Sequence, residues 1–170
     1  SLGLKAAWFF HCRVDGAQAI QGQDRADLLA RRDYLLSRVT APHFGPHEFP
    51  AFLGSQFQGE WAIVTLSMTA LALGGLAQQF PDTADAAQSA LDQIIDRALS
   101  SDLSEFDTQR WHEPALATLS SDRGHIGYLG HLTLILAVRE LRFPGSPHRR
   151  FLGQLTAALA RKLAHGPCGL

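Results

Sequence analysis

The order of hydrophobic and polar positions predicts a chain built from helices. Apolar residues recur at the three- to four-residue spacing of a helix, and the period-two pattern of β-strands is nearly absent. We expect five helices: over residues 17–39 and 59–79, from Pro81 to about residue 98, and over 125–143 and 147–165. The fold class predicted from this pattern is all-α.

The hydrophobicity of these helices alternates along the chain. The first, third and fifth are amphipathic, whereas the second and fourth are apolar on nearly every side, which is typical of enclosed helices. In a simple up-down bundle each helix would have one solvent-exposed polar face. The alternation therefore predicts two layers of antiparallel helical hairpins, arranged as a partial α/α toroid. An ordinary irregular helical domain is the alternative.

The second helix also raises the question of a membrane span. Trp61 to Phe80 contains no charged residue and approaches the roughly 20 apolar residues that a spanning helix needs. Several polar residues interrupt it, among them Thr65, Ser67 and Gln78, and no basic cluster flanks it. We therefore expect a core helix of a soluble protein, with no membrane span.

Two segments are expected to be loops. Residues 40–58 contain three prolines and two glycines, which do not continue a helix. Residues 100–124 are polar and include Asp107, Trp111 and Glu113. Loops of this length are uncommon in compact domains and are often functional.

Composition sets limits on the function. A chain of 170 residues, 46% of them hydrophobic, can form a single helical domain over residues 1–170. A net charge of -1 argues against nucleic acid as a partner. Cys12 and Cys168 lie near opposite ends without CxxC spacing, so neither a zinc site nor a disulfide framework is predicted. The compartment stays undefined, with the cytoplasm slightly favoured.

Candidate chemistry gathers at the predicted start of the two apolar helices. In antiparallel hairpins, helices of one layer run in the same direction, so their N-termini share one face. Helix N-termini favour anionic or hydroxyl-rich ligands. We expect Glu60, His125 and Tyr128 to be catalytic, as a general acid and base with a hydroxyl donor. The residues expected to bind the substrate are Gln56, Gln58, Trp61, Asp107, Trp111 and His131.

No metal or cofactor is expected. On a helix, His125 and His131 would lie about 120° apart and nearly two turns from each other, which gives a polar stripe and not a chelating pair. Glycines at 124, 127 and 130 would admit either a ligand or a neighbouring helix. The alternative is therefore a helix-packing groove whose polar groups are satisfied internally.

The stretches QFQGEWAIVTLSMTALAL and GHIGYLGHLTLILAVREL carry a resemblance to a known family. Over residues 56–163 the chain resembles the front half of α/α-toroid proteins related to linalool dehydratase-isomerase and, more distantly, to sugar epimerases and uronate-acting enzymes. The resemblance implies a central cavity lined by Glu60, His125, Tyr128 and His131, and acid–base isomerisation, elimination or hydration. Fold analogy alone does not settle function.

The chain departs from that pattern in two ways. The linalool enzyme relies on cavity cysteines, whereas Cys12 and Cys168 are terminal here, so terpenoid chemistry is not supported. Five helices are too few to close a six-hairpin toroid, and we expect the chain to be a fragment of a longer one.

The expected function is that of an acid–base enzyme or enzyme fragment, of isomerase or lyase type, with a small hydroxylated or carbohydrate-like substrate. The alternative is a non-catalytic helical binding or scaffold module. For either function, a homo-oligomer or pairing with the missing half of the chain is the expected assembly.

Overall fold

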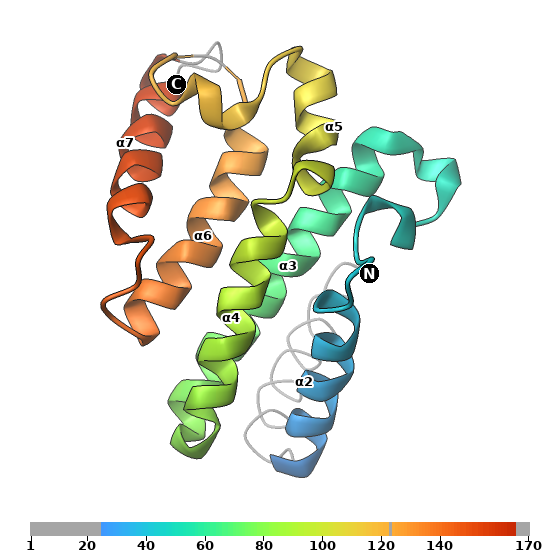
Figure 1. Cartoon of the computed structure of the whole chain (residues 1–170), viewed down its shortest axis with the longest axis vertical. Coiled ribbons are helices and arrows are strands. Elements are labelled where there is room, and N and C mark those ends of the chain that lie inside the picture. The colour runs from blue at the N-terminus through green and yellow to red at the C-terminus, as the bar shows by residue number, and fades with distance from the viewer. Residues whose placement is uncertain (1–24, 123, 166–170) are drawn as a thin grey trace, which may run out of the picture. The chain divides into compact units, whose positions relative to one another are not determined.

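The computed structural model describes residues 25–122 and 124–165, which form helices and turns with no strand among them (Figure 1). The predicted all-α class is confirmed. The chain divides into two compact units, residues 1–34 and 35–170, and each is described by itself. Helix α2 (Arg25–Val39) begins in the first unit and ends in the second, and the part of the predicted helix before Arg25 lies outside the described residues.

The second unit holds the remaining described helices. They are α3 (Gly54–Gln79), α4 (Ala84–Ala98), α5 (Ser101–Trp111), α6 (Ile126–Arg142) and α7 (Arg149–His165). Short 3₁₀ turns join or precede them at Pro46–Glu48, Ala51–Leu53, Pro81–Thr83 and Ala115–Thr118. The bounds of α4, α6 and α7 agree with the sequence pattern to within a few residues. Helix α3 begins earlier than expected, at Gly54, whose left-handed φ of 76° redirects the chain into the helix.

The prediction of a loop over residues 100–124 is wrong, because Ser101–Trp111 forms helix α5. Its buried residues include Leu103 and Phe106, which are three residues apart and share one face. Because polar residues surround this narrow apolar stripe, the helical pattern is hard to recognise in the sequence. The helix ends at His112, which adopts the left-handed conformation with φ 59°.

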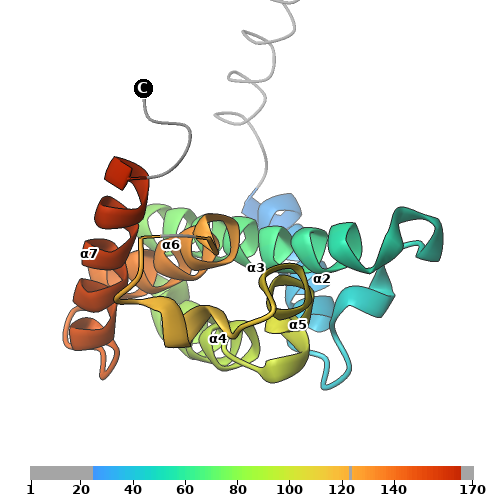
Figure 2. The ribbon, with the colours of Figure 1, turned by 90° about the horizontal axis from the view of Figure 1, so that it is seen from above.

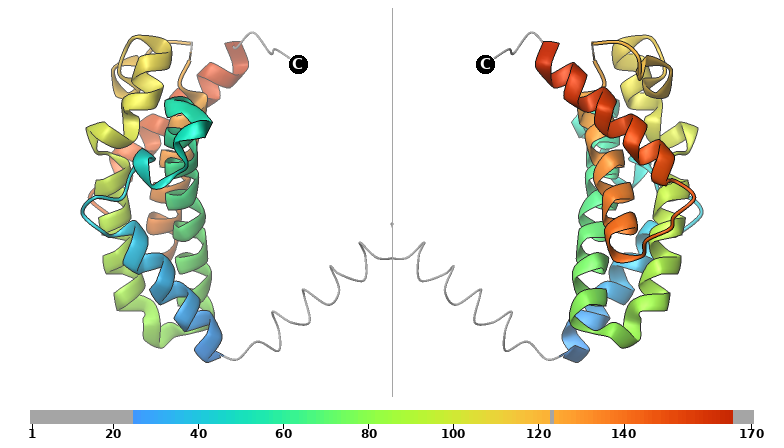
Figure 3. Two further views of the ribbon diagram at one scale, coloured as in Figure 1. Left: turned by 90° about the vertical axis from the view of Figure 1, so that its right-hand side faces the viewer. Right: turned by 90° about the vertical axis from the view of Figure 1, so that its left-hand side faces the viewer.

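Helices α3 and α6 pack against each other and run in the same direction. In Figure 1 both begin near the top, whereas α4 and α7 run back upward. Seen from above, α4 and α5 lie on one side of the α3–α6 pair (Figure 2), and α7 packs antiparallel to α6 (Figure 3). The N-termini of the two most apolar helices therefore share one end of the unit, as expected. The toroid arrangement itself stays a prediction.

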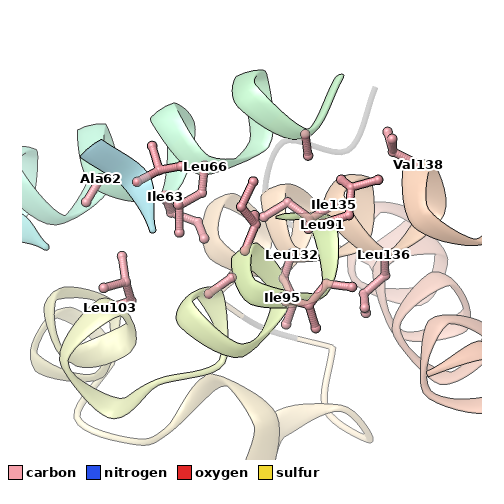
Figure 4. Packing of buried hydrophobic residues seen from close by; sticks show 14 of the residues in the cluster. Ala62, Ile63, Leu66, Leu91, Ile95, Leu103, Leu132, Ile135, Leu136 and Val138 are labelled. Atoms are coloured by element: carbon pink, nitrogen blue, oxygen red, sulfur yellow. The ribbon is translucent and has the colours of Figure 1, made fainter. Parts of the chain in front are cut away.

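The core lies between α3, α4 and α6 and consists mainly of aliphatic side chains (Figure 4). Two glycines let α3 approach its neighbours closely. A Cβ at Gly59 would lie 2.2 Å from Phe106 Cγ on α5, and one at Gly74 would lie 2.7 Å from Val138 Cγ1 on α6. Both distances are shorter than any real Cβ contact, so these positions need glycine.

Helix α3 is not enclosed on all sides, contrary to the sequence pattern. The apolar side chains of Phe57, Trp61, Met68 and Leu71 are exposed along one face. Among the described residues, Ala51–Gln79 is the one helical stretch long and apolar enough to cross a membrane, judged by length and composition only. About 44% of its most apolar 18-residue window is buried inside the protein. That this helix does not cross a membrane therefore stays a prediction.

Candidate functional site

A cavity of about 610 Å³ lies at the shared N-terminal end of α3 and α6. Its walls come from α3, α5, α6 and α7 and from the segment that leads into α6. Ile63, Val64, Phe106 and Leu163 provide apolar surface. The charged side chains in the wall are Glu60, Asp107, Arg110, Asp122 and Lys162. The size falls within the range of pockets that bind small molecules.

Most of the side chains predicted for the site meet at this cavity. Gln56, Glu60, Asp107, Trp111, Tyr128 and His131 all line it. Gln58 does not line it, because its amide donates a hydrogen bond to the Phe49 carbonyl at 2.6 Å. Trp61 does not line it either, and is 51% exposed on the outer face of α3. Binding by Gln58 or Trp61 would need a ligand outside the cavity.

The Glu60 carboxylate is held by contacts to one of its oxygens. Gln56 Nε2 donates to Glu60 Oε1 at 2.7 Å, and Arg110 Nη1 lies 3.4 Å from the same oxygen. Within the described part of the chain, Oε2 has no hydrogen bond. Glu60 can therefore accept a hydrogen bond from a ligand without breaking its existing contacts.

His131 is fixed by a serine on the neighbouring helix. Ser67 Oγ lies 2.8 Å from His131 Nδ1 and 2.9 Å from the Val64 carbonyl oxygen. A hydroxyl has one proton, and both contacts are satisfied together only if Ser67 donates to the carbonyl and accepts from Nδ1–H. In this tautomer Nε2 carries the lone pair, and no hydrogen bond from the described residues reaches it. Burial lowers the pKa of His131 below its ordinary value of 6.5, which keeps the ring neutral at pH 7.

Tyr128 contributes its ring to the cavity wall, but its hydroxyl is already engaged. The hydroxyl donates to the Ala98 carbonyl at 2.8 Å, and the side chain is almost fully buried. Burial raises the pKa of Tyr128, and the charge of Asp107 raises it further. A role as proton donor would require this hydrogen bond to break.

His125 lies behind the cavity wall and does not line it. Its side chain is completely buried, and its Nδ1 is 2.5 Å from Asp107 Oδ2. Nε2 has no hydrogen-bond partner among the described residues and lies 4.0 Å from Glu113 Oε1. The Trp111 ring covers it, with ring centroids 5.6 Å apart. The observed contacts tie α5 to the start of α6, and a catalytic role for His125 stays a prediction.

The glycine repeat before and within α6 has two different uses. At Gly124, a Cβ would lie 2.9 Å from the Trp111 ring, so this glycine does pack closely. At Gly127 and Gly130 nothing lies within 4 Å of such a Cβ. A helix-packing groove is therefore wrong for Gly127 and Gly130, and Gly127 lies in the cavity wall instead.

Sequence reasoning missed three charged side chains of the cavity wall: Arg110, Asp122 and Lys162. A signal for Lys162 existed, because it falls on the buried stripe of α7 that includes Leu155 and Ala158. Arg110 could be placed only once α5 was known to be a helix. No group of three or more potential metal ligands occurs in residues 25–122 and 124–165.

Comparisons of the chain with protein-family models, with curated proteins and with solved structures found no match. The relationship to α/α-toroid proteins therefore stays a prediction that rests on the two apolar-helix stretches.

Proposed function

We propose that the protein is an acid–base enzyme, of isomerase or lyase type, that acts on a small hydroxylated or carbohydrate-like compound in the cavity. The main support is the contact between Ser67 and His131. It orients a neutral imidazole on the cavity wall, and within the described part of the chain the Nε2 lone pair accepts no hydrogen bond. A positioned neutral histidine is a common general base, and such groups contribute about 10²–10⁴-fold to rates.

Glu60 provides the second polar position in the same cavity. Glu60 and Ser67 are seven residues apart on α3, which corresponds to about 10 Å along the helix. Glu60 and the Ser67–His131 pair therefore lie about two helical turns apart along α3, a spacing that suits a compound with polar groups on several carbon atoms. Ile63 and Val64 lie between these positions and offer an apolar surface for the carbon skeleton.

Proton exchange from carbon tests this proposal directly. The protein is incubated in D₂O with a panel of sugars, sugar acids and polyols, and deuterium incorporation is followed by NMR. We expect exchange with the wild-type protein and a loss of about 10²-fold or more in His131→Asn. His43→Asn is the matched control, since His43 is exposed outside the cavity. Equal exchange in wild type and His131→Asn would contradict the proposed role of His131.

A second candidate, a non-catalytic module that pairs with another subunit, is favoured by the exposed face of α3. Phe57, Trp61, Met68 and Leu71 form an apolar stripe of the kind that marks interaction sites. Light scattering coupled to size-exclusion chromatography would test it. An assembly that dissociates in Met68→Glu supports pairing, and a wild-type monomer at high concentration argues against self-association.

A further inference from the structure

Lys162 is a buried amine that the proposed acid–base chemistry does not use. Its side chain is fully buried in α7, in the wall of the cavity. Of the 15 basic residues in the chain, only Lys5 and Lys162 are lysines. Arginine stays protonated in proteins, whereas a buried lysine can become a neutral nucleophile. Within residues 25–122 and 124–165, Lys162 is the one lysine, and it therefore has a basic side chain suited to covalent chemistry at the cavity.

Two hydroxyl groups contact the amine of Lys162. Nζ lies 3.3 Å from both Thr118 Oγ1 and Ser121 Oγ. Each hydroxyl donates its own proton to a carbonyl, of Ala115 and Thr118 respectively, so each can accept from the amine. Distances of 3.3 Å exceed the usual range for N–H···O bonds.

Burial lowers the pKa of Lys162 below its ordinary value of 10.5, and the neighbouring charge of Arg161 acts in the same direction. Glu113, Asp122 and Asp107 each raise it by less than burial lowers it, and the net change in pKa is downward. Desolvation is one of the ways in which proteins activate lysines for attack on carbonyl groups.

We propose that Lys162 is a covalent binding site for small hydroxylated aldehydes and ketones, which it captures as imines in the cavity. The amine adds to the carbonyl carbon, and the carbonyl oxygen takes up a proton to give a carbinolamine. As the C=N bond forms, this hydroxyl leaves as water, which carries both protons lost by the nitrogen. The inference shares the cavity with the proposed function but does not require His131 to act as a base.

Reductive trapping tests the inference. The folded protein is incubated at pH 7 with D-glyceraldehyde and sodium cyanoborohydride, with Nα-acetyl-lysine in the same tube as a reference amine. Adducts are located by peptide mass spectrometry. We expect Lys162 to be modified faster than the reference, because a lowered pKa leaves more of the amine unprotonated. In urea, where the cavity is lost, this advantage should disappear.

Two variants separate the possible explanations. Lys162→Arg keeps a donor to Thr118 and Ser121 and should lose the adduct at this position while remaining folded by circular dichroism. His131→Asn should retain the adduct, so failure of the proposed acid–base function would leave this inference standing. Modification of folded wild-type Lys162 at or below the rate of the reference amine would overturn it.

Discussion

Gly59 is the position where the packing of the cavity wall can be tested most directly. It brings α3 against Phe106 of α5, and Phe106 in turn lines the cavity and packs edge-on against Tyr128 with ring centroids 6.4 Å apart. Gly59→Ala adds one methyl group at this contact. The nearest ring atom would then be 2.2 Å away, whereas tolerable contacts begin near 3.4 Å.

The two separations differ by 1.2 Å, which is more than the few tenths of an ångström that a side chain normally yields. Either α5 shifts or the Phe106 ring leaves its place. Overpacking of this kind costs about 1–3 kcal/mol, and we expect the upper end here. The higher helix propensity of alanine offsets about 1 kcal/mol of this loss. The net loss of stability is therefore about 2 kcal/mol, or about 4–8 °C in Tm.

Urea unfolding followed by far-UV circular dichroism measures this loss. Gly75→Ala is the matched control, because Gly75 lies on the same helix with nothing within 4 Å, and it should stabilise by about 1 kcal/mol. In a Phe106→Ala background the penalty of Gly59→Ala should disappear. If Gly59→Ala proves as stable as wild type while Gly75→Ala behaves as expected, the contact between α3 and α5 is not as described.

Three further predictions concern the polar groups. His125→Asn should lower the free energy of unfolding by about 1–3 kcal/mol, measured in urea. Asparagine tolerates the left-handed backbone of this position, but Asp107 would be left buried without its partner. A change below about 0.5 kcal/mol would contradict this prediction. The lowered pKa of Lys162 should make the stability of the wild type depend on pH. Between the folded-state pKa and 10.5, the unfolded state binds more protons than the folded state, so the free energy of unfolding of the wild type should rise relative to that of Lys162→Met as pH increases. A difference in free energy of unfolding between the two proteins that stays constant from pH 7 to 10 would refute the lowered pKa. Ser67→Ala should mix the two neutral tautomers of His131, visible in its ¹⁵N NMR shifts, and an unchanged spectrum would exclude Ser67 as the orienting group.

Helical periodicity was enough to predict much of the fold. The stripe of Ala87, Leu91, Ile94, Ile95 and Ala98 is fully buried in α4, as its spacing indicates. The same periodicity indicated the end of the molecule at which the cavity lies, because α3 and α6 run in the same direction and so begin at the same end. Both conclusions depend on long segments, in which many positions repeat the same signal.

Short or one-sided patterns were less informative. Helix α5 has only eleven residues, and its polar composition hides the Leu103 and Phe106 pair. For α3, a nearly uniform apolar sequence does not distinguish a helix enclosed by its own chain from one with an exposed apolar face. Lys162 was missed because a charged residue near a helix end is usually solvated, although its spacing from Leu155 and Ala158 places it on the buried stripe of α7.

The two histidines show where helical geometry ceases to predict side-chain direction. His131 lies in the second turn of α6, so its position relative to Tyr128 follows the helical repeat and places it on the cavity wall. His125 precedes the helix, and its left-handed φ of 64° removes it from that repeat and turns its ring towards Asp107. The predicted polar stripe therefore combined two residues with different surroundings: His131 lies on the cavity wall, and His125 is buried against Asp107. Because His131 lines the cavity and His125 does not, the proposed acid–base chemistry should depend on His131, whereas His125 should affect mainly stability.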